Sequence, residues 1–324
     1  MARLRVLVVG AGAVGQVFGR HLQRGGAEVA CFVRERYREA AARGFDLYPL
    51  NGRREPARFE GFAVLTRADE VAARRFDQVY LTVPSPALDG DWLPALIAAC
   101  GDATIVSLQP GLEDRARFLA AGAVEARLVS GMISLLSYAA PLPGETRFAR
   151  PGTAYWFPPL APSPFSGPRE PTAAVVAALR AGKLPAARRA DVPRAAAYPT
   201  AIMMPYLVAL ESAGWSLRTL AQRGAMARAA RGARTALAVV ARGRGIPLYA
   251  QLVARPWVVR TGLWVARRVV PLPLERYFER HFTKVREQTI TLMITYIETG
   301  KRAGLDVAPL EALLAGPATS ISNR

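Results

Sequence analysis

Proton-transfer chemistry could come from a stretch near the C-terminus, residues 274–302, whose apolar periodicity predicts one long helix. On that helix His281 and Lys284 share a stripe, with Glu287 on its flank. An imidazole titrates near neutral pH and can protonate an alkoxide or amine, while an ammonium can polarise a carbonyl or bind a carboxylate. The stripe continues through Gln288, Thr291 and Thr295 rather than the arginine and alanine common elsewhere. The alternative is a solvated polar face of an amphipathic helix, which serves no chemistry.

A glycine-rich turn near the N-terminus, Gly10-Ala11-Gly12-Ala13-Val14-Gly15, follows an apolar run typical of a strand buried on both faces of a parallel sheet. Gly10 permits a tight turn, Gly12 has no Cβ to hold a diphosphate away, and Gly15 lets the next helix pack closely. The free N–H groups of that helix would face the phosphates. The pattern predicts a dinucleotide site at residues 10–15, with a plain strand–turn–helix as the alternative.

The second strand, residues 28–33, ends where a residue that reads the ribose belongs. NAD enzymes usually have an acidic side chain there, which binds both ribose hydroxyls. This chain has Arg34, followed by Glu35 and Arg36. A guanidinium suits a 2′-phosphate, so NADPH is favoured over NADH. The alternative is that Arg34 is an ordinary solvated arginine.

Two more buried strands are predicted at residues 76–83 and 103–108. The first runs into Pro84-Ser85-Pro86, and the second ends in Gln109-Pro110-Gly111. Open α/β sheets bind ligands at the carboxyl ends of their strands. We therefore expect Pro84 and Gln109 to line a nicotinamide pocket.

The fold class expected is α/β, an N-terminal Rossmann doubly wound sheet followed by an all-α C-terminal domain. A proline- and serine-rich stretch at residues 158–171 is interpreted as a linker or domain edge. Beyond it the pattern is helical, at 172–181, 196–216, 225–242 and 274–302. The predicted domains are residues 1–165, which would bind NADP, and residues 172–324, which would serve substrate binding and dimerisation.

The chain of 324 residues is 51% hydrophobic and has a net charge of +18. Only Lys183, Lys284 and Lys301 are lysines, so nearly all cations are arginines, spread along the chain. No basic-aromatic motif or recognition-helix pattern accompanies them. We expect no specific nucleic-acid partner, although some nonspecific adhesion to polyanions is expected.

The two cysteines, Cys31 and Cys100, form neither a disulfide framework nor a zinc-binding spacing. No metal site is predicted, and the cysteines fit a reducing cytoplasm. The apolar N-terminal residues run into the glycine turn rather than a cleavage site, which argues against a signal peptide. A cytoplasmic protein is the expectation.

Two segments raise the question of a membrane. Residues 198–210 are apolar, but two prolines and Glu211 interrupt them, so a buried core helix is favoured over a membrane span. Residues 252–274 combine Trp257 and Trp264 with four arginines. They could contact a membrane surface, although a helix that covers an apolar groove while its arginines snorkel is favoured.

The order of these elements resembles the ketopantoate reductase family over nearly the whole chain. Residues 10–15 match the family's opening turn, and Arg34 matches its 2′-phosphate arginine. Gln109-Pro110-Gly111 stands where the family has an Asn-Gly pair that contacts nicotinamide and substrate, and Glu287 or Gln288 falls near its conserved glutamate. The resemblance implies an NADPH-dependent reductase with its active site between a Rossmann domain and a helical domain.

The chain departs from the family where a lysine general acid and an asparagine stand on the first helix of the second domain. Thr200 occupies the lysine position and Met204 the asparagine position. A threonine hydroxyl cannot deliver a proton as an ammonium does. His281, Lys284 and Glu287 are therefore the candidate catalytic residues.

Two functions remain as hypotheses. The first is hydride transfer from NADPH to a C=O or C=N bond of a small, carboxylate-bearing substrate. The second is a regulatory or binding protein that keeps the nucleotide site and has lost turnover. A homodimer is possible with either.

Overall fold

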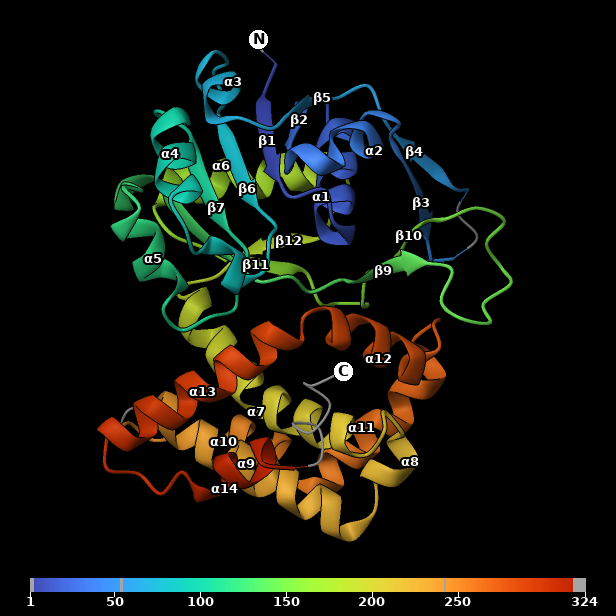
Figure 1. The fold of residues 1–324 in the computed structure, drawn as a ribbon, viewed down its shortest axis with the longest axis vertical. Helices are drawn as coiled ribbons and strands as arrows, with labels where there is room; N and C mark the ends of the chain where they lie inside the picture. Colours follow the sequence, from blue (N-terminus) through green and yellow to red (C-terminus); the bar gives the residue numbers. More distant parts are fainter. Residues whose placement is uncertain (1–2, 53–54, 242, 317–324) are drawn as a thin grey trace. The chain divides into compact units, whose positions relative to one another are not determined.

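The computed structural model describes residues 3–52, 55–241 and 243–316. It divides into two compact units, Met1–Pro193 and Arg194–Arg324. The first is coloured blue to yellow-green in Figure 1 and holds the strands, and the second is coloured gold to red and is helical. The expected α/β domain followed by an all-α domain is confirmed.

An eight-stranded sheet forms the centre of the N-terminal unit. Its order is β12 (Ala186–Arg188), β11 (Ser163–Ser166), β8 (Leu128–Gly131), β7 (Thr104–Ser107), β6 (Gln78–Leu81), β1 (Arg5–Val9), β2 (Glu28–Phe32) and β5 (Ala63–Leu65). Neighbouring strands are parallel except β8 and β11, which are antiparallel. Strand β1 lies between β2 and β6, so the chain reverses its direction of sheet growth there. Such a switch point leaves a crevice at the carboxyl ends of the strands.

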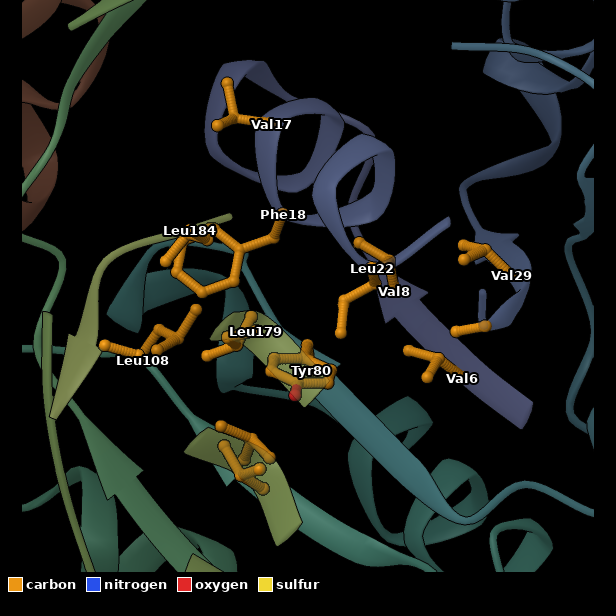
Figure 2. Packing of buried hydrophobic residues seen from close by; sticks show 14 of the residues in the cluster. Val6, Val8, Val17, Phe18, Leu22, Val29, Tyr80, Leu108, Leu179 and Leu184 are labelled. Atoms are coloured by element: carbon orange, nitrogen blue, oxygen red, sulfur yellow. The ribbon is translucent and has the colours of Figure 1, made fainter. Parts of the chain in front are cut away.

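Helices cover both faces of this sheet. On one face α1 (Ala13–Arg24) and α6 (Arg169–Ala181) lie next to each other. Figure 2 shows Phe18 and Leu22 of α1 above Val6, Val8 and Tyr80 of the sheet. The other face is covered by α3 (Ala68–Ala72), α4 (Trp92–Ala99) and α5 (Asp114–Ala120). Burial on both faces explains why the parallel strands are continuous apolar runs.

A smaller sheet in the same unit has the order β4 (Ala57–Phe59), β3 (Phe45–Pro49), β10 (Gly152–Trp156) and β9 (Leu136–Ala140). It packs against α1. Short connecting elements are η1 (Glu35–Tyr37), α2 (Arg38–Ala42), η2 (Ser85–Leu88) and η3 (Glu125–Arg127).

The boundary between the units, after Pro193, lies later than the 165/172 limits expected from the sequence. The stretch interpreted as a linker contains β11, which pairs with β8 and β12 at the sheet edge. The helix expected to open the second domain is α6, which packs on α1. Both therefore belong to the Rossmann unit.

The helical unit holds α7 (Val192–Ser212, which begins two residues before the boundary), α8 (Leu217–Leu220), α9 (Arg223–Ala241), α10 (Leu248–Val253), α11 (Pro256–Val269), α12 (Leu274–Lys284), α13 (Arg286–Arg302) and α14 (Ala308–Leu314). Small residues of α9 allow its neighbours to come close. A Cβ added to Gly232 would lie 2.4 Å from Leu313 and 3.2 Å from Pro205.

The prediction of a single helix over residues 274–302 is wrong. The structure has two helices, α12 and α13, which meet at Val285, whose backbone has φ −106° and ψ 24°. Apolar periodicity continues across the junction, which is why the sequence pattern does not reveal it.

Residues 198–210 lie within α7, which contains Pro199 and Pro205 and has many buried side chains. Across the described ranges, no helix combines the length and the apolar character that crossing a bilayer requires.

Candidate nucleotide site and candidate chemistry

The glycine turn joins β1 to α1 at the switch point of the large sheet. Gly10 has φ +94°, a left-handed conformation that favours glycine, and its N–H donates to the Phe32 carbonyl of β2 at 2.9 Å. A Cβ on Gly15 would lie 2.0 Å from the Gly10 carbonyl oxygen. Gly10 and Gly15 are therefore required by the turn and by the packing of α1.

Thr82, one residue after β6, fixes the turn from the neighbouring strand. Its hydroxyl lies 2.9 Å from the Val9 carbonyl and 2.7 Å from the Gly10 carbonyl. Gln16 of α1 adds a second contact, because its amide donates to the Ala11 carbonyl at 2.8 Å and accepts from Thr153 of β10 at 2.5 Å. These long-range contacts give the turn one fixed shape.

The N-terminal end of α1 fits a diphosphate. Gly12 is the N-cap residue and is exposed, and a Cβ built on it would meet no atom within 4 Å. Among the described residues no side chain caps the helix, and Ala13, Val14 and Gly15 bring no acidic group to the first turn. Free N–H groups and the helix dipole at such an end favour an anion.

Arg34 follows β2 and is exposed. Its neighbour Glu35 accepts hydrogen bonds from the Thr66 hydroxyl at 2.5 Å and from Arg38 at 2.9 Å, and these bonds lower the pKa of Glu35. Arg38 also donates to Glu70 at 3.1 Å. The acidic group beside Arg34 is thus engaged with Arg38, and within the described residues no ion pair involves Arg34.

Gln109 ties the ends of two strands together. Its amide nitrogen donates to the carbonyls of Leu81 at 3.0 Å and Val83 at 2.8 Å. Its amide oxygen lies 3.0 Å from both the Ser107 hydroxyl and the Leu108 N–H, each of which donates to it. All donors and acceptors of this amide are used, so Gln109 positions the loops after β6 and β7. Pro84, on the β6 loop, is exposed.

A buried residue that the sequence interpretation missed, Asp114, joins the same two loops. One of its carboxylate oxygens accepts from the Ser85 hydroxyl and from the Gly111 N–H, each at 2.6 Å. The side chain is 4% exposed. The sequence does contain a local sign of the contact with Gly111. Asp114 stands three positions after Gly111, at the turn that opens α5, and this spacing is typical of a carboxylate that caps a helix. The contact with Ser85 has no local signal.

His281 and Lys284 lie near the end of α12, and Glu287 lies in the first turn of α13. The His281 ring stacks on Tyr277 at 5.3 Å between centroids and meets the edge of Phe282 at 4.8 Å. Burial and the nearby Lys284 charge lower the pKa of His281 to about 4. This lowering works against the expectation that His281 titrates near neutrality. Lys284 and Glu287 are exposed.

Thr200 and Met204, which are expected from the sequence to stand at the positions of the family's lysine and asparagine, are both buried in α7. The Thr200 hydroxyl donates to the Ala196 carbonyl one turn earlier at 2.8 Å. Glu211, at the end of the same helix, pairs with Arg286 at 2.6 Å. Neither Thr200 nor Met204 offers an acidic proton.

The remaining candidates for chemistry have structural roles. Cys31 and Cys100 are free and buried, and burial raises the pKa of each thiol to about 12. His21 is buried in α1 with its Nδ1 2.7 Å from the Gly182 carbonyl oxygen. Over the parts of the chain that the structure describes, no cluster of three or more metal-binding side chains occurs.

Comparison with known proteins finds a family whose model matches part of the N-terminal unit. Residues 6–161 match the family model described as ketopantoate reductase PanE/ApbA. No curated protein sequence matches the chain.

Solved structures match nearly the full length of the chain. The PanE/ApbA family ketopantoate reductase from Ralstonia eutropha JMP134 has a TM-score of 0.72 at 20% identity, covering 96% of both chains. The 2-dehydropantoate 2-reductase from Geobacter metallireducens GS-15 has a TM-score of 0.71 at 19% identity, covering 98% of both. A D-mandelate dehydrogenase described in a ternary structure with NADH and anilino(oxo)acetate has a TM-score of 0.73 at 14% identity, covering 96% of both.

These structural likenesses are fold-level, whereas the family model matches sequence within the N-terminal unit, where the glycine turn lies. The chain thus matches the ketopantoate reductase family model over residues 6–161 and has the fold of solved ketopantoate reductases over nearly its whole length.

Proposed function

We propose that this chain is an NADPH-dependent reductase that transfers hydride to a C=O or C=N bond of a small, carboxylate-bearing substrate. The observation that carries the proposal is the β1–α1 turn. Gly12 stands in open space before an uncapped helix, and no acidic residue lies in the first turn. Such an arrangement suits a diphosphate, because the free N–H groups at the start of a helix favour an anion.

The preference for NADPH rests on the end of β2. Arg34 is exposed there, while Glu35 is held by Arg38 and Thr66. A guanidinium can form paired, charge-assisted hydrogen bonds with a 2′-phosphate, and the neighbouring Glu35 carboxylate already pairs with Arg38. The D-mandelate dehydrogenase with a similar fold is described with NADH, so the fold alone does not determine the coenzyme.

The coenzyme would supply the hydride, and the protein must supply orientation and a proton. Gly12, with the first N–H groups of α1, would hold the diphosphate. Gln109 and Asp114 would hold the loops after β6 and β7 in place beside the nicotinamide. These residues act on orientation, and none of them is proposed as the proton donor.

For the proton we favour Lys284 over His281. With a pKa lowered to about 4, His281 carries almost no proton at neutral pH. Lys284 is exposed, and its positive charge could also bind a substrate carboxylate. Glu287 is the third candidate, as an exposed carboxylate in the first turn of α13.

A second function, a nucleotide-binding protein without turnover, is favoured by one observation. The hydroxyl at the family's lysine position, that of Thr200, is used within α7, and the asparagine position is a buried methionine. If Lys284 does not replace the missing acid, the chain would bind NADPH and reduce nothing.

The test is a pair of measurements on the same protein. Titration calorimetry with NADPH and NADH examines the nucleotide site. NADPH oxidation with a panel of 2-keto acids and imines, followed by absorbance, then examines turnover. Binding with turnover supports the reductase, and binding without turnover on any compound supports the second function. Absence of heat with both coenzymes contradicts both.

A further inference from the structure

One segment of the helical unit has an unusual charge. Residues 212–274 hold no aspartate, glutamate or lysine. The segment's eleven arginines are Arg218, Arg223, Arg228, Arg231, Arg234, Arg242, Arg244, Arg255, Arg260, Arg267 and Arg268. The cations are spread along the chain as expected, but the acidic residues that would balance them are missing here. A strong positive potential is therefore concentrated on this part of the protein.

The ten of these arginines that the structure describes are all exposed, and none forms an ion pair with a described carboxylate. Arg268 instead stacks over the Trp264 ring at 3.6 Å. Unpaired arginines on a surface attract polyanions, of which a nucleic acid, an anionic membrane and an acidic protein are the common kinds.

Exposed apolar side chains at α10 and α11 favour the membrane. The α10–α11 surface, as we call residues 248–269, has large apolar groups in solvent: Leu248 is 70% exposed, Tyr249 55%, Trp257 58%, Trp264 57% and Val269 56%. Every residue of α11 is at least partly exposed. Nucleic-acid phosphates would leave these groups in water, whereas a bilayer interface accepts both tryptophan rings and arginines.

A second copy of the chain fits this surface less well than a membrane. In a two-fold dimer the same patch meets itself, so Arg255, Arg260, Arg267 and Arg268 would face their own copies. No acidic residue of the segment could pair with them. The positive charge of this surface is complementary to anionic lipid, whereas it repels the same surface on a second copy of the chain.

A cavity of about 560 Å³ lies where α9, α10 and α11 contribute side chains. Arg234 and Arg255 line it together with Leu237, Ile246 and Trp257. The two guanidinium groups suit a lipid phosphate. The apolar neighbours suit the uncharged glycerol and the acyl chains of the same lipid.

We propose that the α10–α11 surface binds anionic lipid membranes, with α11 lying in the plane of the interface. The tryptophans and valines enter the boundary between headgroups and acyl chains. The arginines contact lipid phosphates, and the cavity beside Trp257 receives a headgroup. The inference is independent of the proposed reductase function, because it involves only the helical unit.

The test is flotation of the full-length protein with vesicles. One set contains phosphatidylcholine alone, and the other contains phosphatidylcholine and phosphatidylglycerol in equal parts. We expect binding only to the second set, weakened by salt. Replacing Arg260, Arg267 and Arg268 with glutamine should weaken partitioning roughly a hundredfold, because each arginine near an anionic surface contributes about fivefold.

Trp257→Ser combined with Trp264→Ser should weaken binding at high salt as well. The matched control replaces Arg218, Arg223 and Arg228, on or next to α8 and α9, with glutamine. It removes the same charge from the same acid-free segment and should retain most of the binding. Circular dichroism verifies that each variant is folded.

Several outcomes would overturn the proposal. They are no binding to anionic vesicles, equal weakening by the control variant, or binding that the tryptophan substitutions leave unchanged at high salt. A dimer that the tryptophan substitutions dissociate, with no vesicle binding, would identify a second copy as the occupant. Binding to duplex DNA or RNA but not to vesicles would identify a nucleic acid.

Discussion

Gly12 and Gly15 are separated by one helical turn, but they are glycines for different reasons. Gly15 is constrained by its neighbours, since a Cβ there would lie 2.0 Å from the Gly10 carbonyl oxygen. Gly12 has open space, and its φ of −73° suits any residue. The protein alone would tolerate a side chain at Gly12. The diphosphate proposed to bind there would not.

The substitution Gly12→Asp therefore separates folding from binding. Aspartate is a favourable N-cap, so the melting temperature should stay the same or rise. NADPH affinity should fall more than about a hundredfold, because like charges about 4 Å apart repel by about 4 kcal/mol near a protein surface. Calorimetry and thermal unfolding measure the two effects. Gly15→Ala is the control and should lower the melting temperature. Unchanged NADPH binding in Gly12→Asp would contradict the site.

Arg34→Ala examines the choice of coenzyme. Loss of a charge-assisted contact with the 2′-phosphate should weaken NADPH binding by about 1.5–3 kcal/mol, or roughly 10- to 100-fold. NADH affinity should change little, because NADH has no phosphate at that position. Arg24→Ala removes an equal charge from an exposed site at the end of α1 and serves as the control. Equal weakening of both coenzymes would show that Arg34 acts only through general charge.

At the scale of single residues, the sequence predicted the roles of residues whose contacts lie near them in the chain. The glycine turn is one such case, because Gly15 is explained by its closeness to Gly10, and Gly10 by its own positive φ and its hydrogen bond to the next strand. Gln109 and Asp114 hold the loops after β6 and β7 together, and they do so through groups that lie 26 to 29 residues away in the sequence. The position of Gln109 at the end of a strand predicted that it lies at a ligand site. That position could not distinguish a residue that contacts a ligand from one that holds a loop.

Among the elements, the loops after β6 and β7 depend on the Gln109 amide. Gln109→Leu would leave the carbonyls of Leu81 and Val83 and the N–H of Leu108 without this partner. Each unsatisfied buried group costs about 1–3 kcal/mol, so the free energy of unfolding should fall by several kcal/mol. Urea denaturation measures it, with exposed Gln222→Leu as the control. If Gln109→Leu lowers the free energy of unfolding no more than the control does, Gln109 does not hold the two loops in place.

Helix α12 carries a pH dependence through His281. Its pKa is about 4 in the folded protein, against about 6.5 when unfolded. As pH falls from about 6.5 to about 4 the unfolded chain binds the extra proton first, so stability decreases. Above that window both states are neutral and the effect vanishes. The loss is at most about 3 kcal/mol, and less where solvent reaches the ring.

His281→Phe should remove that part of the acid loss while keeping the stacking on Tyr277. Lys284→Met should raise the pKa of His281, because the lysine charge is one cause of its lowering. With only two histidines in the chain, proton NMR titration can follow each ring. A His281 ring that titrates near 6.5 in the wild-type protein would contradict this account and restore His281 as a proton donor.

For the whole molecule, the sequence predicted the fold class because buried parallel strands and amphipathic helices have distinct local patterns. The division between units depends on pairing that no local pattern reports. Strand β11 is four residues in a proline- and serine-rich stretch, and only its contacts with β8 and β12 assign it to the sheet. The junction at Val285 is hidden for a similar reason, since one turn residue leaves the apolar spacing intact.

Two compact units should respond differently to NADPH. A ligand that binds only the folded state stabilises what it contacts by about 2.7 kcal/mol at a hundred times its Kd. The residues proposed to hold the coenzyme all belong to the Met1–Pro193 unit. Hydrogen exchange in β1 and α1 should therefore slow by up to roughly a hundredfold. Exchange in α9 should change far less, and NADH at the same concentration is the control. Equal slowing in both units would show that the coenzyme stabilises the molecule as one cooperative body.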